Sequence, residues 1–382
     1  MLIGSYEKAI QRVTEMTVYT KKIEPVPSIN ETKEALTTLK TILKSSAYGK
    51  TGSLDPELTA LLKDIKNIGE KNLNNVYPNE FTPNNEYLKT MPDIQNGSSA
   101  LIKGSKKRIQ HVGISNFRLP VKFRTKSSSA ITLETSVTGS VSLEADKKGV
   151  NMSRIMRSFY KTNEEQFSFD VITKAIGLYK KDLDSFDARI QMKFSFPMKI
   201  TSLRSGLEGY QYYDICLEVI DFDNVTKKIM HLDYVYSSTC PCSLELSEHA
   251  RSVRNQMATP HSQRSVARIS IELNPKFSTF WFEDLVELCR QAVPTETQVM
   301  VKREDEQAFA ELNGANPIFV EDAVRSFAEK LSEEKKIRDY KILASHQESL
   351  HSHDAISLLT EGKTFQQDSL EPNTFKSLFH TG

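Results

Sequence analysis

The chain has 382 residues, of which 38% are hydrophobic, and its 50 basic and 49 acidic side chains give a formal net charge of +1. This composition is typical of a folded protein with one large core or two smaller ones and argues against disorder as the main state. The balanced charge provides no global attraction to nucleic acid or to an anionic membrane, so an anionic ligand must be held by a local cluster of cations.

The N-terminal residues MLIGSYEKAIQRVTEMTVYTKK lack the apolar core and the small-residue cleavage site of a signal peptide. No stretch approaches the roughly 18 apolar residues of a membrane span. We therefore expect a cytoplasmic protein that binds neither membrane nor nucleic acid. Four cysteines in such a chain are not expected to form a disulfide framework, and the apolar surroundings of Cys216 and Cys289 predict core residues.

The chain begins with a segment distinct from the rest. Capped helices are predicted within residues 29 to 72, and the Asn- and Pro-rich residues 73 to 90 are predicted to form a linker. The main domain is expected to begin near Met91. We therefore divide the chain into an N-terminal helical extension (1–90) of open role, a main domain (91–355) and a tail (356–382) without strong periodicity.

The main domain is rich in segments that alternate apolar and polar residues, which indicates strands: 111–124, 130–145, 187–203, 210–223, 227–238, 265–275 and 296–303. Helical patterns interrupt them in pairs, 152–162 with 167–183 and 280–293 with 316–336. The last helix has an apolar stripe of Val320, Val324, Phe327 and Leu331, with Asn316 and Pro317 suited to its cap and first position. Antiparallel strands with segregated helix pairs predict an α+β fold.

The first chemically suggestive cluster is the segment STCPCS (238–243), which is followed by PHSQRS (260–265). Cys240 and Cys242 flank a proline, and His261 lies 21 residues after Cys240. A zinc knuckle needs paired ligands on both sides, so a structural zinc site is disfavoured here but not excluded.

Acidic residues form a second cluster where the predicted strand 296–303 ends. Glu304, Asp305 and Glu306 offer oxygen ligands for a metal, and a solvated acidic turn is the alternative. Glu321, early in the predicted helix 316–336, is by itself compatible with a surface carboxylate.

The segment HQESLHSHDA holds three of the eight histidines, His346, His351 and His353. In an extended segment His351 and His353 share one side, and imidazoles suit proton transfer near neutral pH. A structural role remains the alternative. Cations that could bind phosphate recur near these clusters, although the chain has no glycine-rich phosphate loop; they are Arg154, Arg157, Arg264, Lys302 and Arg303.

Seven segments, taken in order, resemble the signature of the GTP cyclohydrolase type IB family, the prokaryotic alternative to the zinc-dependent type IA enzyme. They are MPDIQN (91–96), KKGVNMSR (147–154), STCPCS (238–243), PHSQRS (260–265), VKREDE (301–306), NPIFVEDAVR (316–325) and ESLHSHDA (348–355). The resemblance implies the tunnelling fold (T-fold): antiparallel sheets with helix pairs on one face, two modules per chain, and a homotetramer with active sites at subunit interfaces. It also implies hydrolysis of GTP to formate and 7,8-dihydroneopterin triphosphate, the first step towards tetrahydrofolate and a source for queuosine.

The resemblance also implies roles for individual residues. The family's metal ligands fall on Cys240, His261 and Glu306, an arrangement that leaves a position for a water molecule. Mixed soft and hard donors do not select one metal, and the family tolerates manganese, iron or zinc. The carboxylate that anchors guanine falls on Glu321, and the proton-shuttling histidines fall on His351 and His353. For the triphosphate we expect Arg154, Arg264, Lys302 and Arg303.

Two departures from the family pattern stand out. Asn151 occupies the position before MSR where the family commonly has histidine, so an imidazole role there is in doubt. The spacing between Cys240 and His261 is longer than in the shorter members, which predicts an extra turn or loop and adds His249 as a weaker candidate ligand. Two other functions remain open: another T-fold enzyme acting on pterins or deazapurines, and a non-catalytic metal-binding paralogue.

Overall fold

The computed structural model describes residues 80–92, 104–127, 130–162, 169–183, 185, 187–277, 279–366, 371 and 373–378. The chain divides into two compact units, Met1–Asp93 and Ile94–Gly382. The helices predicted within residues 29 to 72 lie outside the described residues.

The described part of the first unit contains one short helix, α4 (Asn85–Thr90). The side chain of Asn84 caps it by accepting a hydrogen bond of 2.8 Å from the N–H of Tyr87. The helix lies within the segment that we predicted to be a linker. Asparagine favours both turns and helix caps, which explains the difference.

The second unit is built on one antiparallel sheet in which each strand pairs with the next strand in the sequence. The strands are β1 (Ile109–Arg124), β2 (Ala130–Leu143), β3 (Ala188–Thr201), β4 (Glu208–Phe222), β5 (Val225–Thr239), β6 (Ser262–Leu273), β7 (Ile337–His346) and β8 (Ala355–Glu361).

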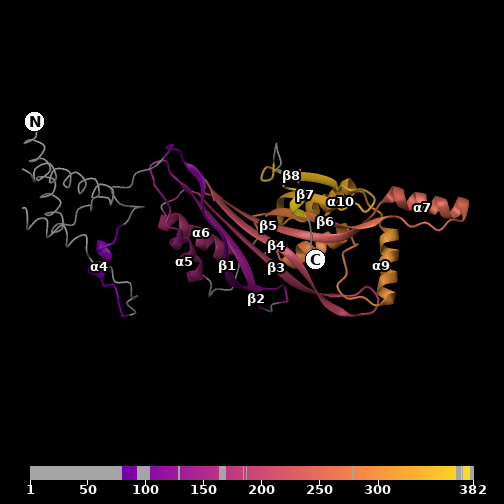
Figure 1. The fold of residues 1–382 in the computed structure, drawn as a ribbon, viewed down its shortest axis with the longest axis horizontal. Coiled ribbons are helices and arrows are strands. Elements are labelled where there is room, and N and C mark those ends of the chain that lie inside the picture. The colour runs from indigo at the N-terminus through magenta and orange to yellow at the C-terminus, as the bar shows by residue number, and fades with distance from the viewer. Residues whose placement is uncertain are drawn as a thin grey trace, which may run out of the picture. The chain divides into compact units, whose positions relative to one another are not determined.

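Helices interrupt the sheet at corresponding places in its two halves (Figure 1). Between β2 and β3 lie α5 (Met152–Thr162) and α6 (Phe169–Leu183), and between β6 and β7 lie α8 (Phe282–Ala292), α9 (Arg303–Ala315) and α10 (Val320–Glu333). A further helix, α7 (Pro241–Arg254), joins β5 to β6, and a 3₁₀ turn spans Lys376–Leu378. The expected α+β fold, with a T-fold arrangement of two modules, is confirmed. The first module comprises β1–β4 with α5 and α6, and the second comprises β5–β8 with α7–α10. No helix in the described ranges has the length and hydropathy needed to cross a bilayer.

The core lies between the helices and one face of the sheet. Alternate residues of β4, such as Ile215 and Leu217, are buried there, because side chains of a strand point to opposite faces in turn. The predicted stripe of α10 is buried in the same core, and so is Cys289. Cys216 differs from the prediction because it follows Ile215 and therefore points to the other face, where it is half-buried and burial raises its pKa to about 12.

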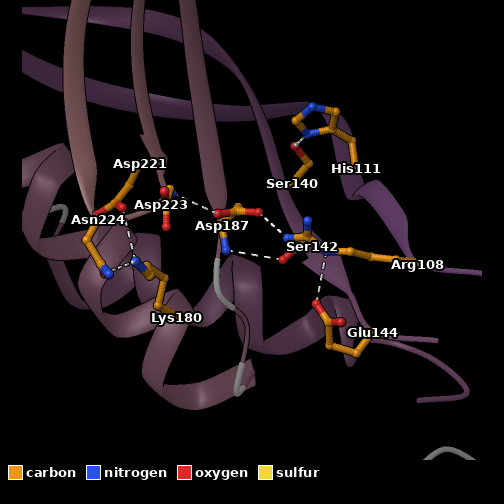
Figure 2. Close-up of polar contacts among 10 residues, drawn as sticks. All are labelled: Arg108, His111, Ser140, Ser142, Glu144, Lys180, Asp187, Asp221, Asp223 and Asn224. Carbon is orange, nitrogen blue, oxygen red and sulfur yellow. Dashed lines mark hydrogen bonds and ion pairs between the residues drawn. The ribbon is translucent and has the colours of Figure 1, made fainter. Parts of the chain in front are cut away.

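A polar network joins the strand ends of the first module (Figure 2). The guanidinium of Arg108 donates to Glu144 at 3.0 Å and also to the carboxylate of Asp187. The backbone N–H of Asp187 donates to Ser142 at 3.1 Å, and its carboxylate accepts from the N–H of Asp223 at 3.1 Å. Asp187 therefore ties together β1, β2 and the turn between β4 and β5.

Three predicted boundaries are wrong. Residues 296–303 form no strand: Glu296 makes an isolated bridge to Tyr236, beyond the end of the β4–β5 pairing, and Val299 and Val301 further on are exposed. Helix α10 starts at Val320 with Phe319 as its N-cap, not at Pro317 with Asn316 as its cap. The chain before Phe319 is not helical, because the N–H of Ile318 donates to the carbonyl oxygen of Thr239 at the end of β5. Strand β8 lies in the segment that we expected to be an aperiodic tail.

Candidate active site

The thiol of Cys240 is held where β5 meets α7. Strand β5 ends at Thr239, and Cys240 occupies the N-cap of α7, with Pro241 at the first helical position, where proline is favoured. The N–H of Cys240 donates to the carbonyl oxygen of His261 at 3.2 Å, and its own carbonyl accepts from Leu244 at 3.0 Å. Cys240 is half-buried, as expected for a ligand at a strand end, whereas Cys242 is exposed.

His261 lies directly opposite Cys240, immediately before β6. The next residue, Ser262, pairs with Thr239 across the β5–β6 ladder. The N–H of His261 also donates to the hydroxyl of Ser243 at 3.1 Å, so the first turn of α7 fixes the backbone of the histidine. The insertion that we predicted to be an extra turn or loop is thus the helix α7, which begins beside this pair, and residues 255–260 return the chain from its end to His261.

One nitrogen of the His261 imidazole, Nδ1, faces two hydrogen-bond acceptors. Its Nδ1 lies 2.9 Å from Oε1 of Gln263 and 3.6 Å from Oε2 of Glu348. Both partners can accept a hydrogen bond, which favours the tautomer with the proton on Nδ1 and the lone pair on Nε2. Gln263 is itself held by a 2.7 Å bond from its amide to the buried hydroxyl of Ser238. The imidazole is therefore oriented in the tautomer that a metal ligand requires.

The start of α10 is fixed to the same end of β5. The N–H of Ile318 donates to the carbonyl of Thr239 at 2.9 Å. Glu321 follows three residues later, in the first turn of α10, and is exposed. The structure thus brings the predicted guanine anchor to the strand end that carries Cys240.

The predicted proton-shuttling histidines lie in the loop between β7 and β8, residues 347–354, which we call the histidine loop. His346 pairs with both Ser265 of β6 and Ala355 of β8, so this loop emerges beside the start of β6. His351 and His353 are exposed, and their rings stack with centroids 4.9 Å apart and an interplanar angle of 13°. They lie at the end of the sheet that carries His261.

Glu306 is not brought to the Cys240–His261 pair within one chain. It is exposed in the first turn of α9, whereas Asn313, near the end of α9, contacts Thr239 at 3.4 Å. Seven residues of helix correspond to about 10 Å. Within the described ranges, no three Cys, His, Asp or Glu side chains are grouped closely enough to hold a metal.

The neighbouring Asp305 has a structural role instead. Its buried carboxylate accepts 2.8 Å hydrogen bonds from the backbone N–H groups of Arg204, Ser205 and Lys302. These bonds join the start of α9 to the β3–β4 hairpin and lower the pKa of the carboxyl against the effect of burial. His249 is also displaced from the pair, because it lies nine residues after Cys240 along α7, about 13 Å by helical rise.

The predicted phosphate-binding cations divide into three groups. Arg264 is exposed at the start of β6, and its carbonyl accepts from the N–H of Gln347 in the histidine loop at 3.3 Å. Lys302 and Arg303 are exposed at the start of α9, beside Glu306. Arg154 belongs to α5 in the other module, and its side chain lies outside the described residues. Just before α5, Asn151 accepts a 2.7 Å bond from Ser153.

The sequence did not single out Gln263 and Glu348 as site residues. Both lie inside segments that we recognised, PHSQRS and ESLHSHDA, next to the histidines named from them. Their polar, hydrogen-bonding side chains were the available signal. The Gln263 contact joins side chains two residues apart in the chain, whereas the Glu348 contact depends on the β6–β7 register, which local sequence does not specify.

A thiol and an oriented imidazole on adjacent strands fit a divalent metal, which prefers sulfur and nitrogen donors of this kind. The fold and this pair define a T-fold protein with a candidate metal-dependent active site at one end of its sheet.

Comparison with known proteins identifies the family. Residues 91–357 match the model of type I GTP cyclohydrolase folE2. The chain is 62% identical over 367 residues to GTP cyclohydrolase FolE2 of Roseobacter denitrificans and 61% identical over 368 residues to that of Dinoroseobacter shibae. Each alignment covers 96% of this chain and 100% of the relative. The chain therefore belongs to the GTP cyclohydrolase FolE2 family.

Among solved structures, uricase from Arthrobacter globiformis aligns with a TM-score of 0.45 at 10% identity, over 69% of this chain and 96% of that chain. At this level of similarity, no property of the uricase is carried over to this chain.

Proposed function

We propose that the protein is a GTP cyclohydrolase whose active site is the sheet end that carries Cys240, His261, Glu321 and the histidine loop. It hydrolyses GTP to formate and 7,8-dihydroneopterin triphosphate, the first step of tetrahydrofolate biosynthesis. Full-length identity of 62% to a relative named GTP cyclohydrolase FolE2 supports the activity. The observation that carries the site is the backbone pairing of Cys240 with His261, whose Nδ1 faces Gln263 and Glu348 so that Nε2 is the nitrogen available to a metal.

Cys240 and His261 would hold a divalent metal, manganese, iron or zinc, with Glu306 as the third ligand. When bound, such a metal supplies a water molecule of lowered pKa for attack at C8 of the purine. The chain's own contribution is orientation. Gln263 and Glu348 keep the proton of His261 on Nδ1, and the N-cap position fixes the thiol.

The remaining site residues would bind and protonate the substrate. The carboxylate of Glu321 can accept hydrogen bonds from the ring N–H and the exocyclic amino group of guanine. His351 and His353 can donate a proton to the departing ring nitrogen, because imidazole titrates near neutral pH. The triphosphate would be bound by cations from both modules, namely Arg154, Arg264, Lys302 and Arg303.

The wide separation of these groups supports a site completed by assembly. Arg154 lies on α5 of the first module, and Glu306 lies about 10 Å along α9 from the residue that contacts Thr239. We therefore propose a homotetramer in which neighbouring chains contribute to one site. The catalytic domain would begin at residue 91 and include strand β8, which ends at Glu361, with an N-terminal extension before it and a shorter tail after it. A cytoplasmic location would give access to the GTP pool, and the product could also supply queuosine synthesis.

The decisive assay is incubation of the purified protein with GTP and manganese, iron or zinc, followed by oxidation and detection of both a fluorescent pterin and formate. If neither product forms with any of the three metals, the proposed activity is wrong, and a non-catalytic metal-binding role becomes the better account.

Co-expression tests whether a site draws ligands from two chains. Chains with Cys240→Ala and chains with Glu306→Ala are each expected to be inactive. Mixed oligomers regain activity only if the two ligands of one site come from different chains. No recovery, in oligomers shown to contain both chains, places Cys240 and Glu306 in the same chain and requires α9 to shift when the metal binds.

A further inference from the structure

A cavity of about 580 Å³ lies between the two modules, on the helix-covered side of the sheet. The first module contributes the end of β1, the start of α6 and Leu217 of β4. The second contributes the start of β5, the β6–α8 loop and the α10–β7 loop. Its volume is in the range of pockets that hold small organic ligands.

Aromatic rings form much of the cavity wall: Phe123, Phe169, Phe277, Phe280, Trp281 and Phe282. Phe123 and Phe282 are buried, with ring centroids 6.2 Å apart. Trp281 is half-buried and caps α8, and Phe277 is exposed. Such rings offer flat apolar faces on which a planar ligand can stack.

Positive charge lines the same cavity. The lining includes three cationic side chains, those of Arg124, Lys228 and Lys336, and one carboxylate, that of Asp170. The net charge of the lining is therefore +2. Lys228 pairs with Asp170 at 2.9 Å, and the Arg124 guanidinium carbon lies 6.0 Å from the centroid of the Trp281 ring. A wall that combines aromatic faces with excess positive charge is complementary to an aromatic anion.

The backbone of Lys336 is held in place by a hydrogen bond from the other loop. Its carbonyl accepts a 2.8 Å hydrogen bond from the N–H of Asn274, which joins the two loops of the second module that line the cavity. Among the described residues, its ammonium has no carboxylate within ion-pair distance. A ligand anion would supply the missing partner.

The cavity is remote from the candidate active site of its own chain. Lys228 lies near the start of β5, whereas Cys240 follows its last residue, 12 positions on. At the rise of an extended strand this corresponds to about 40 Å. A ligand in the cavity would therefore not touch the Cys240–His261 pair.

We propose that this cavity is a second binding site, which takes a planar heteroaromatic molecule bearing an anionic group. The ring stacks on the aromatic wall that includes Trp281, and the anion pairs with Lys336 and Lys228. Because the wall comes from both modules, the ligand contacts both and stabilises their packing. Substrate and product of the reaction belong to this chemical class, but the site stands on its own geometry and does not depend on catalysis.

Trp281 provides a direct readout, because it is the only tryptophan in the chain. The full-length protein is titrated with pterin-6-carboxylate, which has a ring and an anion, with pterin, which has the ring alone, and with inorganic triphosphate, which has the charge alone. We expect saturable quenching of tryptophan emission, with pterin-6-carboxylate bound roughly tenfold more tightly than pterin. Triphosphate alone should produce little quenching.

Two variants localise the signal. Lys336→Ala should weaken binding of pterin-6-carboxylate roughly tenfold and leave pterin unchanged, whereas Lys335→Ala, an exposed neighbour outside the cavity lining, should change neither. Glu321→Gln, which alters the proposed guanine anchor of the active site, should leave the quenching intact. Absence of saturable quenching, equal affinities in Lys336→Ala and the unchanged protein, or loss of quenching in Glu321→Gln would each overturn the proposal.

Discussion

The backbone N–H of Cys240 donates to the carbonyl oxygen of His261 at 3.2 Å, so the thiol and the imidazole leave adjacent strands at the same level. Cys240→Ala keeps this backbone bond but removes the sulfur ligand. We expect bound metal and turnover to fall by at least about a hundredfold, because loss of supporting partners alone typically costs 10- to 100-fold. Cys242→Ala is the matched control, since Cys242 is exposed and should tolerate the change. Equal losses of metal in the two variants would refute the assignment of Cys240.

Gln263 should act through His261 rather than on the substrate. Gln263→Ala removes the acceptor at 2.9 Å from Nδ1 and leaves the more distant carboxylate of Glu348, at 3.6 Å. We expect metal affinity to fall about 10- to 100-fold, with turnover restored at saturating metal. Metal titration combined with kcat measured at each metal concentration tests this. A fall in kcat that excess metal does not reverse would show that Gln263 has another role.

His346 should make the fold sensitive to mild acid. It is buried against the hydroxyl of Tyr236 at 2.9 Å, and burial lowers its pKa to about 4. The unfolded chain, with a histidine pKa near 6.5, binds a proton that the folded chain excludes. The difference in pKa therefore contributes about 3 kcal/mol to the free energy of unfolding, and this contribution is complete above pH 6.5 and is lost as pH falls towards 4.

Urea denaturation between pH 7 and 4.5 measures this effect, with His346→Gln as the comparison because it cannot titrate. The unchanged protein should lose stability more steeply over this range than the variant. The buried Glu218 does not confuse the result. Burial opposes its ionisation, but hydrogen bonds from His231 and Arg189 outweigh burial and lower its pKa to about 2, so its contribution is lost only below about pH 4.5. Parallel pH profiles would contradict the assignment.

Two glycines should respond to alanine in opposite directions. A Cβ at Gly113 in β1 would lie 1.9 Å from the carbonyl oxygen of Gly139 in β2, so Gly113→Ala should destabilise the protein by about 1–3 kcal/mol. At Gly177, in α6, a Cβ meets no atom within 4 Å. Gly177→Ala should stabilise by about 0.5–1 kcal/mol, because alanine favours the helix. Urea midpoints of the two variants test both signs, and a stable Gly113→Ala protein would show that the β1–β2 pairing differs.

Strand β3 was predicted correctly from alternation, because one of its faces is buried. Strands β5 and β6 were also predicted, although both of their faces are largely buried. Strand β7 was missed because both its faces are largely covered, so its residues do not alternate. The false strand at residues 296–303 shows the opposite case, since its apolar residues Val299, Met300 and Val301 are exposed. Alternation reports burial of one face and cannot identify a pairing partner.

The site was predictable to the level of residue type and motif order. Short motifs pointed to Cys240, His261 and Glu321, which the structure places at one end of the sheet. The sequence could not predict that Asp305 has a structural role while Glu306 is exposed. Burial of Asp305 depends on hydrogen bonds to the β3–β4 hairpin, about 100 residues earlier in the chain.

The order of strands in the sheet follows the order of strands in the chain. Most pairings therefore close short loops, as in the turn at Asp223 and Asn224 between β4 and β5. The entropic cost of each closure is small when the loop is short. Two helices lie between β2 and β3 and one lies between β5 and β6, but the longest connection is β6–β7, which must place three helices before β7 can pair. During synthesis the first four strands can thus pair before the last two exist, and docking of β7 is expected to be the slow step of folding.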